Sequence, residues 1–180
     1  MHLTGGQFKG RKIKTPSCAR PTLSLVRESV FNILYSHFGD FSQKKFFDMF
    51  LGSSVMTFEA LSRGFDVISC DIDSNAVKMA KTNALEFKLS PLIIKSDAIR
   101  YLKNTNETFD VIYIDPPWDS SYLEIIATLK DKLNRDAIAI FECDKKKKPE
   151  VALQINSQDS FELFKEKNYG RCCLLFVKLR

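Results

Sequence analysis

Short apolar runs alternate with helical patterns between residues 44 and 143, and this alternation restricts the chain to few folds. The apolar runs predict strands within 44–50, 65–73, 91–97, 109–115 and 135–143. The segments between them predict helices within 55–63, 74–87, 98–104 and 121–133. Repeats of this kind form a mainly parallel sheet with helices on both faces. We therefore predict a doubly wound α/β sheet, completed by an antiparallel strand pair within 160–179.

The first 38 residues follow a different pattern. LTGGQFKGRKI, residues 3–13, alternates glycines, bases and single apolar residues, which predicts a short β-hairpin with a flexible turn. Two prolines exclude a regular element from the segment that follows, and residues 23–38 have the spacing of an amphipathic helix. We predict a basic N-terminal hairpin arm, residues 1–22, followed by a single domain over 23–180.

The net charge of the chain lies in its N-terminal part. Residues 1–30 contain six basic residues against one acidic residue, which accounts for the whole formal charge of +5. A compact basic segment on an otherwise neutral protein indicates contact with a polyanion. The alternative is a solvated segment that keeps the protein soluble.

Composition excludes several classes of protein. No apolar run approaches the roughly 20 residues that a membrane-spanning helix needs, and the N-terminus lacks the apolar core of a secretory signal. The five cysteines show no CxxC spacing and there are only two histidines, so we expect reduced, buried thiols and no metal site. We expect a cytoplasmic protein that does not bind membranes.

Aspartates mark the ends of the first four predicted strands. They are Asp48, Asp71, Asp97 and Asp115. Ligands of doubly wound sheets bind beyond the carboxyl ends of the strands, so this pattern indicates a binding site. A carboxylate in the position of Asp71 can accept both hydroxyls of a ribose. Each aspartate could instead cap the helix that follows it, which is common at such junctions.

The sequence DPPW, residues 115–118, is the most specific motif. Its prolines lack N–H groups and hold the chain extended, so a helix cannot continue through it. Rigid oxygen acceptors beside an aromatic ring suit a flat group that bears an amine. The amine would donate to the Asp115 carboxylate and the Pro116 carbonyl, while the ring stacks on Trp118. Two such acceptors aim the nitrogen lone pair at an electrophile.

DPPW matches the [DN]PP[FYW] motif of amino-methyltransferases that use S-adenosylmethionine. With TGGQFKGRKI at 4–13, RPTLSLVRESVFNIL at 20–34, DMFLGSS at 48–54, EALSRG at 59–64 and KNYGRCCLLF at 167–176, the chain resembles the RsmD family. Members of that family are guanine-N2 methyltransferases of small-subunit ribosomal RNA. The resemblance covers nearly the whole chain and implies a Rossmann-like methyltransferase fold.

The resemblance also implies roles for individual residues. The cofactor S-adenosylmethionine would bind the strand ends and the loop after the first strand: Asp48, Phe50, Gly52, Ser53, Ser54, Asp71, Ile72, Asp97 and Ala98. The amine-binding motif would be catalytic: Asp115, Pro116, Pro117 and Trp118. Ribosomal RNA, in the small subunit or an assembly intermediate, would contact the N-terminal arm and its boundary: Lys9, Arg11, Lys12, Arg20, Thr22 and Arg27. We expect a monomer without a metal.

One position departs from the family pattern DxFxGSG, because Ser54 stands where the last glycine belongs. A serine there is strained if the backbone needs a positive φ, yet we expect cofactor binding to survive. Two alternatives fit the same fold. One is a methyltransferase for another amine, such as adenine N6 or a glutamine side chain. The other is a non-catalytic RNA-binding assembly factor. A nicotinamide-dependent oxidoreductase would show a fuller glycine motif.

Overall fold

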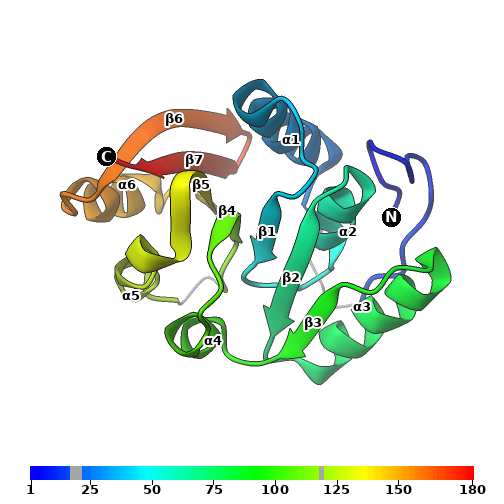
Figure 1. Ribbon diagram of the computed structural model, residues 1–180. Coiled ribbons are helices and arrows are strands. Elements are labelled where there is room, and N and C mark those ends of the chain that lie inside the picture. Colours follow the sequence, from blue (N-terminus) through cyan, green and yellow to red (C-terminus); the bar gives the residue numbers. More distant parts are fainter. Residues whose placement is uncertain (17–21, 118–119) are drawn as a thin grey trace. The chain divides into compact units, whose positions relative to one another are not determined.

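The computed structural model describes residues 1–16, 22–117 and 120–180 (Figure 1). It divides into two units, Met1–Asp97 and Ala98–Arg180. The predictions for Arg20, Trp118 and the segment 17–21 lie outside the described residues. Each unit combines strands with helices that pack against them. The predicted α/β class is confirmed.

The first unit contains three parallel strands in the order β3-β2-β1. Their bounds are β1 Lys45–Asp48, β2 Asp66–Asp71 and β3 Leu92–Lys95. Its helices are α1 Ser24–Phe38, α2 Val55–Ser62 and α3 Ser74–Phe87. All six elements fall within the segments predicted from the apolar periodicity, because each has a buried face in this unit.

The second unit contains four strands in the order β4-β5-β7-β6. The strands are β4 Phe109–Ile114, β5 Leu133–Asp144, β6 Phe161–Tyr169 and β7 Cys172–Leu179. β4 and β5 are parallel, whereas β7 runs antiparallel to both β5 and β6. The remaining elements are α4 Ala98–Asn104, α5 Tyr122–Ala127, the 3₁₀ turn η1 Lys130–Lys132 and α6 Lys148–Asn156. The predicted antiparallel C-terminal pair is confirmed.

Three details differ from the sequence prediction. Helix α6 was not predicted, because only Val151 and Ile155 of its residues are buried, which is too few for a clear apolar period. The helix predicted over 121–133 ends at Ala127 and continues as a 3₁₀ turn. The predicted N-terminal hairpin is a series of turns closed by one antiparallel bridge, between His2 and Lys12.

The N-terminal arm is fixed to α2 by close backbone contacts. The amide of Gln7 donates to the Ser62 carbonyl at 2.7 Å, and the amide of Phe8 donates to the Ser62 hydroxyl at 2.9 Å. That hydroxyl in turn donates to the Gly5 carbonyl at 2.6 Å. Gly6 has φ +73, and a Cβ there would lie 1.9 Å from the Ser62 carbonyl oxygen, so only glycine fits. The arm therefore supplies partners to the end of α2, where helical carbonyls lack them.

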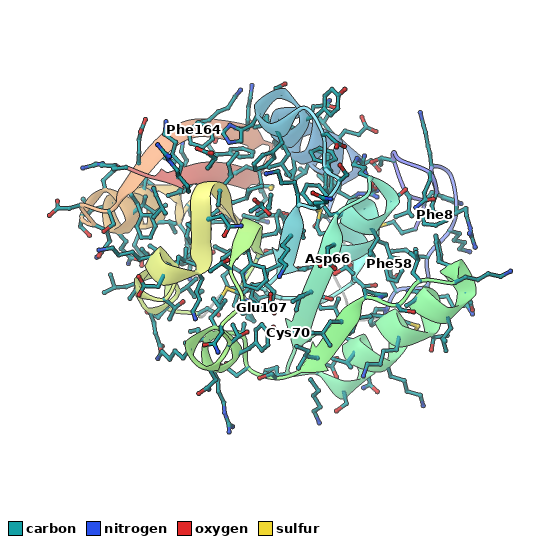
Figure 2. All side chains as sticks on the ribbon, viewed as in Figure 1. Phe8, Phe58, Asp66, Cys70, Glu107 and Phe164 are labelled. Carbon is teal, nitrogen blue, oxygen red and sulfur yellow. The ribbon has the colours of Figure 1, made fainter. Side chains whose placement is uncertain are left out.

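The arm also packs on α3. The buried Asn83 side chain accepts from the Lys14 amide at 3.0 Å and donates to the Lys14 carbonyl at 2.8 Å. The Arg11 guanidinium lies 4.0 Å from the centroid of the Phe87 ring. Phe87 in turn contacts Phe8 of the arm and Phe58 of α2, with ring centroids 5.1 Å and 5.4 Å away. Phe8 and Phe58 are labelled in Figure 2. The described part of the arm is thus built into the first unit.

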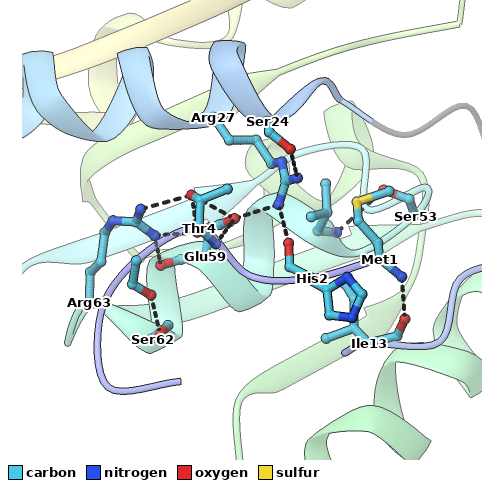
Figure 3. Close-up of polar contacts among 12 residues, drawn as sticks. Met1, His2, Thr4, Ile13, Ser24, Arg27, Ser53, Glu59, Ser62 and Arg63 are labelled. Carbon is cyan, nitrogen blue, oxygen red and sulfur yellow. Dashed lines mark hydrogen bonds and ion pairs between the residues drawn. The ribbon is translucent and has the colours of Figure 1, made fainter. Parts of the chain in front are cut away.

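A buried carboxylate connects the arm, α1 and α2 (Figure 3). Glu59 is fully buried and ion-paired with both Arg27 and Arg63. The Arg27 guanidinium donates to Glu59 Oε1 at 2.5 Å and to the His2 carbonyl at 3.0 Å. The Thr4 amide donates to the same Glu59 oxygen at 2.8 Å. A carboxylate away from water is stable only with such donors, so these contacts depend on one another.

We predict that Glu59→Gln destabilises the protein by about 3–5 kcal/mol, because it leaves two buried or half-buried arginines without their counter-charge. Urea unfolding measures the change. The control is Glu124→Gln, which removes an exposed partner of Lys103 at 3.5 Å and should change stability by less than about 1 kcal/mol. Equal losses in the two variants would contradict this account.

Candidate active site

Carboxylates collect at one edge of the three strands of the first unit. β1 ends at Asp48 and β2 ends at Asp71, and the two strands run in the same direction. β3 ends at Lys95, and Asp97 follows two residues later as an exposed side chain. Because carboxyl ends of parallel strands share one edge, the three predicted aspartates of this unit lie along that edge.

Asp48 is buried and acts on the helix that follows it. Its Oδ2 accepts from the Thr57 amide at 3.1 Å and from the Thr57 hydroxyl at 2.7 Å. Burial raises the pKa of Asp48 to about 6, the Thr57 hydrogen bonds oppose that rise, and the nearby charge of Asp71 adds to it. The capping role that sequence alone offered as an alternative is therefore present at Asp48.

Asp71 holds the loop that follows β1. Its Oδ2 accepts from the Gly52 amide at 2.8 Å, and its Oδ1 accepts from the Asp73 amide at 2.8 Å. Gly52 has φ +44, which few other residues adopt readily. Ile72, the next residue, exposes 67% of its surface, which is unusual for a large apolar side chain beside a strand end. Each oxygen of Asp71 retains a lone pair for a further donor.

Ser54 adopts the conformation that the family pattern assigns to glycine. Its φ is 62° and its ψ is 7°, in the left-handed region, at the start of α2. The side chain is 1% exposed, and its hydroxyl finds no hydrogen-bond partner among the residues that the structure describes. The condition for strain is met, and an unpaired hydroxyl adds to its cost. Ser53, also buried, keeps an ordinary backbone and accepts from the Val55 amide at 3.4 Å.

The end of β4 in the second unit carries the proline motif. Asp115 is half-buried, Pro116 is buried and Pro117 is exposed. The Ser120 amide donates to the Pro117 carbonyl at 3.0 Å, and Ser121 begins α5 by accepting from the Glu124 amide at 3.4 Å. As predicted, no helix continues through the prolines. The proposed stacking on Trp118 falls outside the described residues.

The predicted RNA-binding residues separate into two groups. Lys9, Arg11 and Lys12 are exposed on the arm, as contact with RNA requires. Arg27 is 2% exposed and committed to Glu59, and Thr22 is 9% exposed. The prediction for Arg27 is corrected: its charge stabilises the interior of the first unit and is not available to a phosphate.

The sequence prediction also missed a polar pair near the proline motif. The buried Tyr113 hydroxyl donates to Glu142, which lies on the neighbouring strand β5. Burial, followed by the charges of Glu142 and Asp115, raises the pKa of Tyr113 well above its ordinary value. The available signal was a glutamate in the otherwise apolar run AIAIFEC.

Two further observations concern residues 1–16, 22–117 and 120–180. Within these ranges, no three His, Cys, Asp or Glu side chains gather closely enough to hold a metal ion. No described helix is long and apolar enough to cross a membrane.

Asp48 generates a prediction about pH. The pKa of Asp48 is about 6 in the folded protein, whereas its ordinary value is 3.8. Between these two pH values the folded state therefore binds more protons than the unfolded state. Its stability therefore falls as the pH rises from about 4 to about 6. Asp48→Asn should remove this fall, and its free energy of unfolding at pH 7.5 should exceed that of wild type by about 2–3 kcal/mol. Urea unfolding at several pH values, without cofactor, measures it.

The control for this experiment is Asp66→Asn, the same change at an exposed aspartate at the start of β2. It should leave the wild-type pH profile in place. An Asp48→Asn protein that is less stable than wild type at every pH would contradict the burial argument.

Ser54 generates a second prediction. Ser54→Gly should stabilise the protein by about 1 kcal/mol, because it relieves the strain of a left-handed serine backbone and removes an unpaired hydroxyl. The greater entropy of glycine in the unfolded state opposes these gains and is included in that figure. Thermal unfolding should show a rise of about 2–4 °C. Ser53→Gly, the matched control, loses a hydrogen bond without relieving strain and should lower the melting temperature.

Titration calorimetry on the same variants compares their affinity for S-adenosylmethionine. Wild-type protein should bind it. A melting temperature that falls in Ser54→Gly would contradict the strain argument, and binding that appears only in Ser54→Gly would contradict the expected survival of the site.

Comparison with known proteins supplies the family. Residues 1–178 match the family described as conserved hypothetical protein 95. Ribosomal RNA small subunit methyltransferase D of Buchnera aphidicola is 30% identical over 187 residues, which cover 98% of this chain and 93% of that protein. YlbH of Bacillus subtilis is 34% identical over 156 residues, 81% of this chain and 83% of its own length.

Solved structures agree with these relatives. yhhF from Escherichia coli superposes with a TM-score of 0.83 at 26% identity, over 99% of this chain and 97% of that one. A ribosomal protein L11 methylase from Lactobacillus delbrueckii, at 21% identity, has a TM-score of 0.72 over 84% of this chain and 77% of that one, which bears on the fold alone. The predicted Rossmann-like methyltransferase fold is confirmed. A family match over nearly the whole length, joined by these relatives, shows that the chain belongs to the RsmD family of ribosomal RNA methyltransferases.

Proposed function

We propose that this protein transfers a methyl group from S-adenosylmethionine to the exocyclic N2 amine of a guanine in small-subunit ribosomal RNA. Membership of a family of ribosomal RNA methyltransferases supports methyl transfer, and the methyltransferase relatives and fold imply S-adenosylmethionine as the methyl donor. The Asp115–Pro116–Pro117 segment at the end of β4 carries the proposal of an amine target, because it has the residue types that an amine acceptor needs. The choice of guanine N2 rests on the resemblance of the sequence to the RsmD family.

The residues of the first unit fit the cofactor. Asp71 can accept from ribose hydroxyls with its remaining lone pairs, and the exposed Ile72 offers an apolar face to adenine. Gly52 is exposed in the turn at the same strand edge, where the methionine part is proposed to bind, and Ser53 follows it in that turn. Asp97, the last residue of the first unit, and Ala98, which follows it in the chain, are proposed to meet the polar edge of adenine. When bound, S-adenosylmethionine supplies an electrophilic methyl on a sulfonium.

The residues of the second unit act on the amine. In this proposal the Asp115 carboxylate and the Pro116 carbonyl accept hydrogen bonds from the two N–H groups of the amine. This arrangement favours a pyramidal nitrogen whose lone pair points at the electrophile. The amine is a weak nucleophile while its lone pair is delocalised, so this orientation is the main contribution. Once the nitrogen is alkylated it is strongly acidic, and the Asp115 carboxylate takes its proton.

The exposed arm residues Lys9, Arg11 and Lys12 are proposed to contact the RNA backbone. Because the arm is fixed to α2 and α3, these charges have a defined place on the first unit. The partner would be the small subunit or one of its assembly intermediates, which implies action in the cytoplasm. A non-catalytic assembly factor shares this RNA contact and differs only in the absence of methyl transfer.

Transfer of a tritiated methyl group tests the proposal, with small subunits from cells that lack the gene as acceptor. Wild-type protein should label the RNA, and nucleoside analysis should identify N2-methylguanosine. Asp115→Ala should lower the rate by at least about 100-fold while its calorimetric affinity for S-adenosylmethionine stays unchanged. The control is Asp131→Ala, an exposed aspartate of η1 in the same unit.

Two outcomes would contradict the proposal. RNA binding without any label would identify an assembly factor. Label in N6-methyladenosine would identify a methyltransferase for another amine.

A further inference from the structure

Three strands of the second unit bring a carboxylate and two donors together. One carboxylate oxygen of Glu142, on β5, accepts a hydrogen bond from the hydroxyl of Tyr113, on β4. Its other oxygen accepts a hydrogen bond from the thiol of Cys172, on β7, at a Sγ–Oε1 distance of 3.3 Å. Tyr113 is 1% exposed, so the donor that holds Glu142 is itself fixed by packing. Strand-borne donors on both oxygens leave the carboxylate little freedom.

The register of β4 and β5 places Glu142 beside the proline motif. Ile114, the last residue of β4, lies opposite Phe141, so Asp115 and Glu142 follow at the same level of two parallel neighbours. Side chains alternate along strands, so Tyr113 and Asp115 share a face, and Glu142 meets Tyr113 on that face. After burial and the charge of Glu142, the charge of Asp115 also raises the pKa of both Tyr113 and Cys172, which agrees with this arrangement.

The amine acceptors alone do not distinguish guanine from adenine. Asp115 and Pro116 accept N–H groups, and both bases carry an exocyclic amine. The neighbouring ring atom differs: guanine presents an N1–H donor beside its 2-amino group, whereas adenine presents an N1 acceptor beside its 6-amino group. An ionised carboxylate only accepts hydrogen bonds, so it pairs with the first arrangement and opposes the second.

We propose that Glu142 selects guanine, by accepting the N1–H of the base whose 2-amino group binds Asp115 and Pro116. The inference rests on the proposed function and names the residue that determines its specificity. Tyr113 and Cys172 are positioning residues, since they hold the Glu142 carboxylate and do not touch the base. Glu142 already accepts from a donor on each oxygen. An ionised carboxylate has about four acceptor sites, so the base N1–H is proposed as an additional donor to it.

The experiment compares two RNA substrates, one with the natural guanosine and one with 2-aminopurine at the same position. 2-Aminopurine keeps the 2-amino group but presents an acceptor at N1. A hydrogen bond to a charged group, once lost, lowers kcat/KM by about 10- to 100-fold. Wild-type protein should prefer guanosine by that factor. The position is found beforehand, by sequencing the RNA of small subunits that the wild-type protein has methylated. Both RNAs are then assembled into small subunits and used as substrates.

Glu142→Gln should lower kcat/KM on guanosine by about 10- to 100-fold and abolish or reverse the preference, because its amide can donate to the N1 of 2-aminopurine. Tyr113→Phe keeps the ring packing and should reduce the preference several-fold, because Glu142 loses a fixed donor. The matched control is Glu162→Gln, which removes a half-exposed carboxylate of β6 that pairs with Lys178 at 3.3 Å. Its kinetics should equal those of wild type on both RNAs.

The outcomes separate the inference from the proposed function. If wild-type protein forms no N2-methylguanosine, the proposed function itself is wrong. If it forms this product but methylates 2-aminopurine equally well, the inference is overturned without any variant. A Glu142→Gln protein with unchanged preference overturns it as well. Thermal unfolding and calorimetric affinity for S-adenosylmethionine establish that each variant is folded.

Discussion

A carboxylate that leaves water must be given hydrogen-bond donors, and much of this structure follows from that requirement. The buried Glu59 takes two guanidinium groups and the buried Asp48 takes both donors of Thr57. Asp71 is only half-buried, and it takes two backbone amides as well. Each donor belongs to an element that the carboxylate thereby positions. In the first unit, acidic residues at strand ends order a helix start and a loop, and an acidic residue on α2 orders the arm.

The same requirement links stability with function. Asp48 retains a cost of burial despite its two hydrogen bonds, as its raised pKa indicates. Ser54 carries a second cost in the adjoining loop, through its left-handed backbone and unpaired hydroxyl. Backbone strain of this kind concentrates at functional sites, where the surrounding structure maintains it. Both costs fall within residues 48–54, the end of β1 and the loop after it, to which the resemblance assigns the cofactor.

The sequence predicted the elements well where they are locally determined. The bounds of α3 match the prediction at 74–87, because buried positions recur at helical spacing and Asp73 caps its start through the Asn75 amide. Contacts between distant residues were not predictable. Arg27 was taken for an RNA ligand because its partner Glu59 lies 32 residues away. Helix α6 has too weak an apolar period, and the pairing of Tyr113 with Glu142 depends on a strand register that sequence does not supply.

The fixed arm has a consequence for the order in which the chain can fold. Its partners on α2 and α3 lie 55 to 69 residues further along the chain, at Glu59, Ser62 and Asn83. During synthesis the arm therefore leaves the ribosome well before the groups that hold it exist, and it can settle only after both helices have formed. Until then Lys9, Arg11 and Lys12 belong to a mobile cationic tail, and completion of the first unit fixes these three residues on its surface.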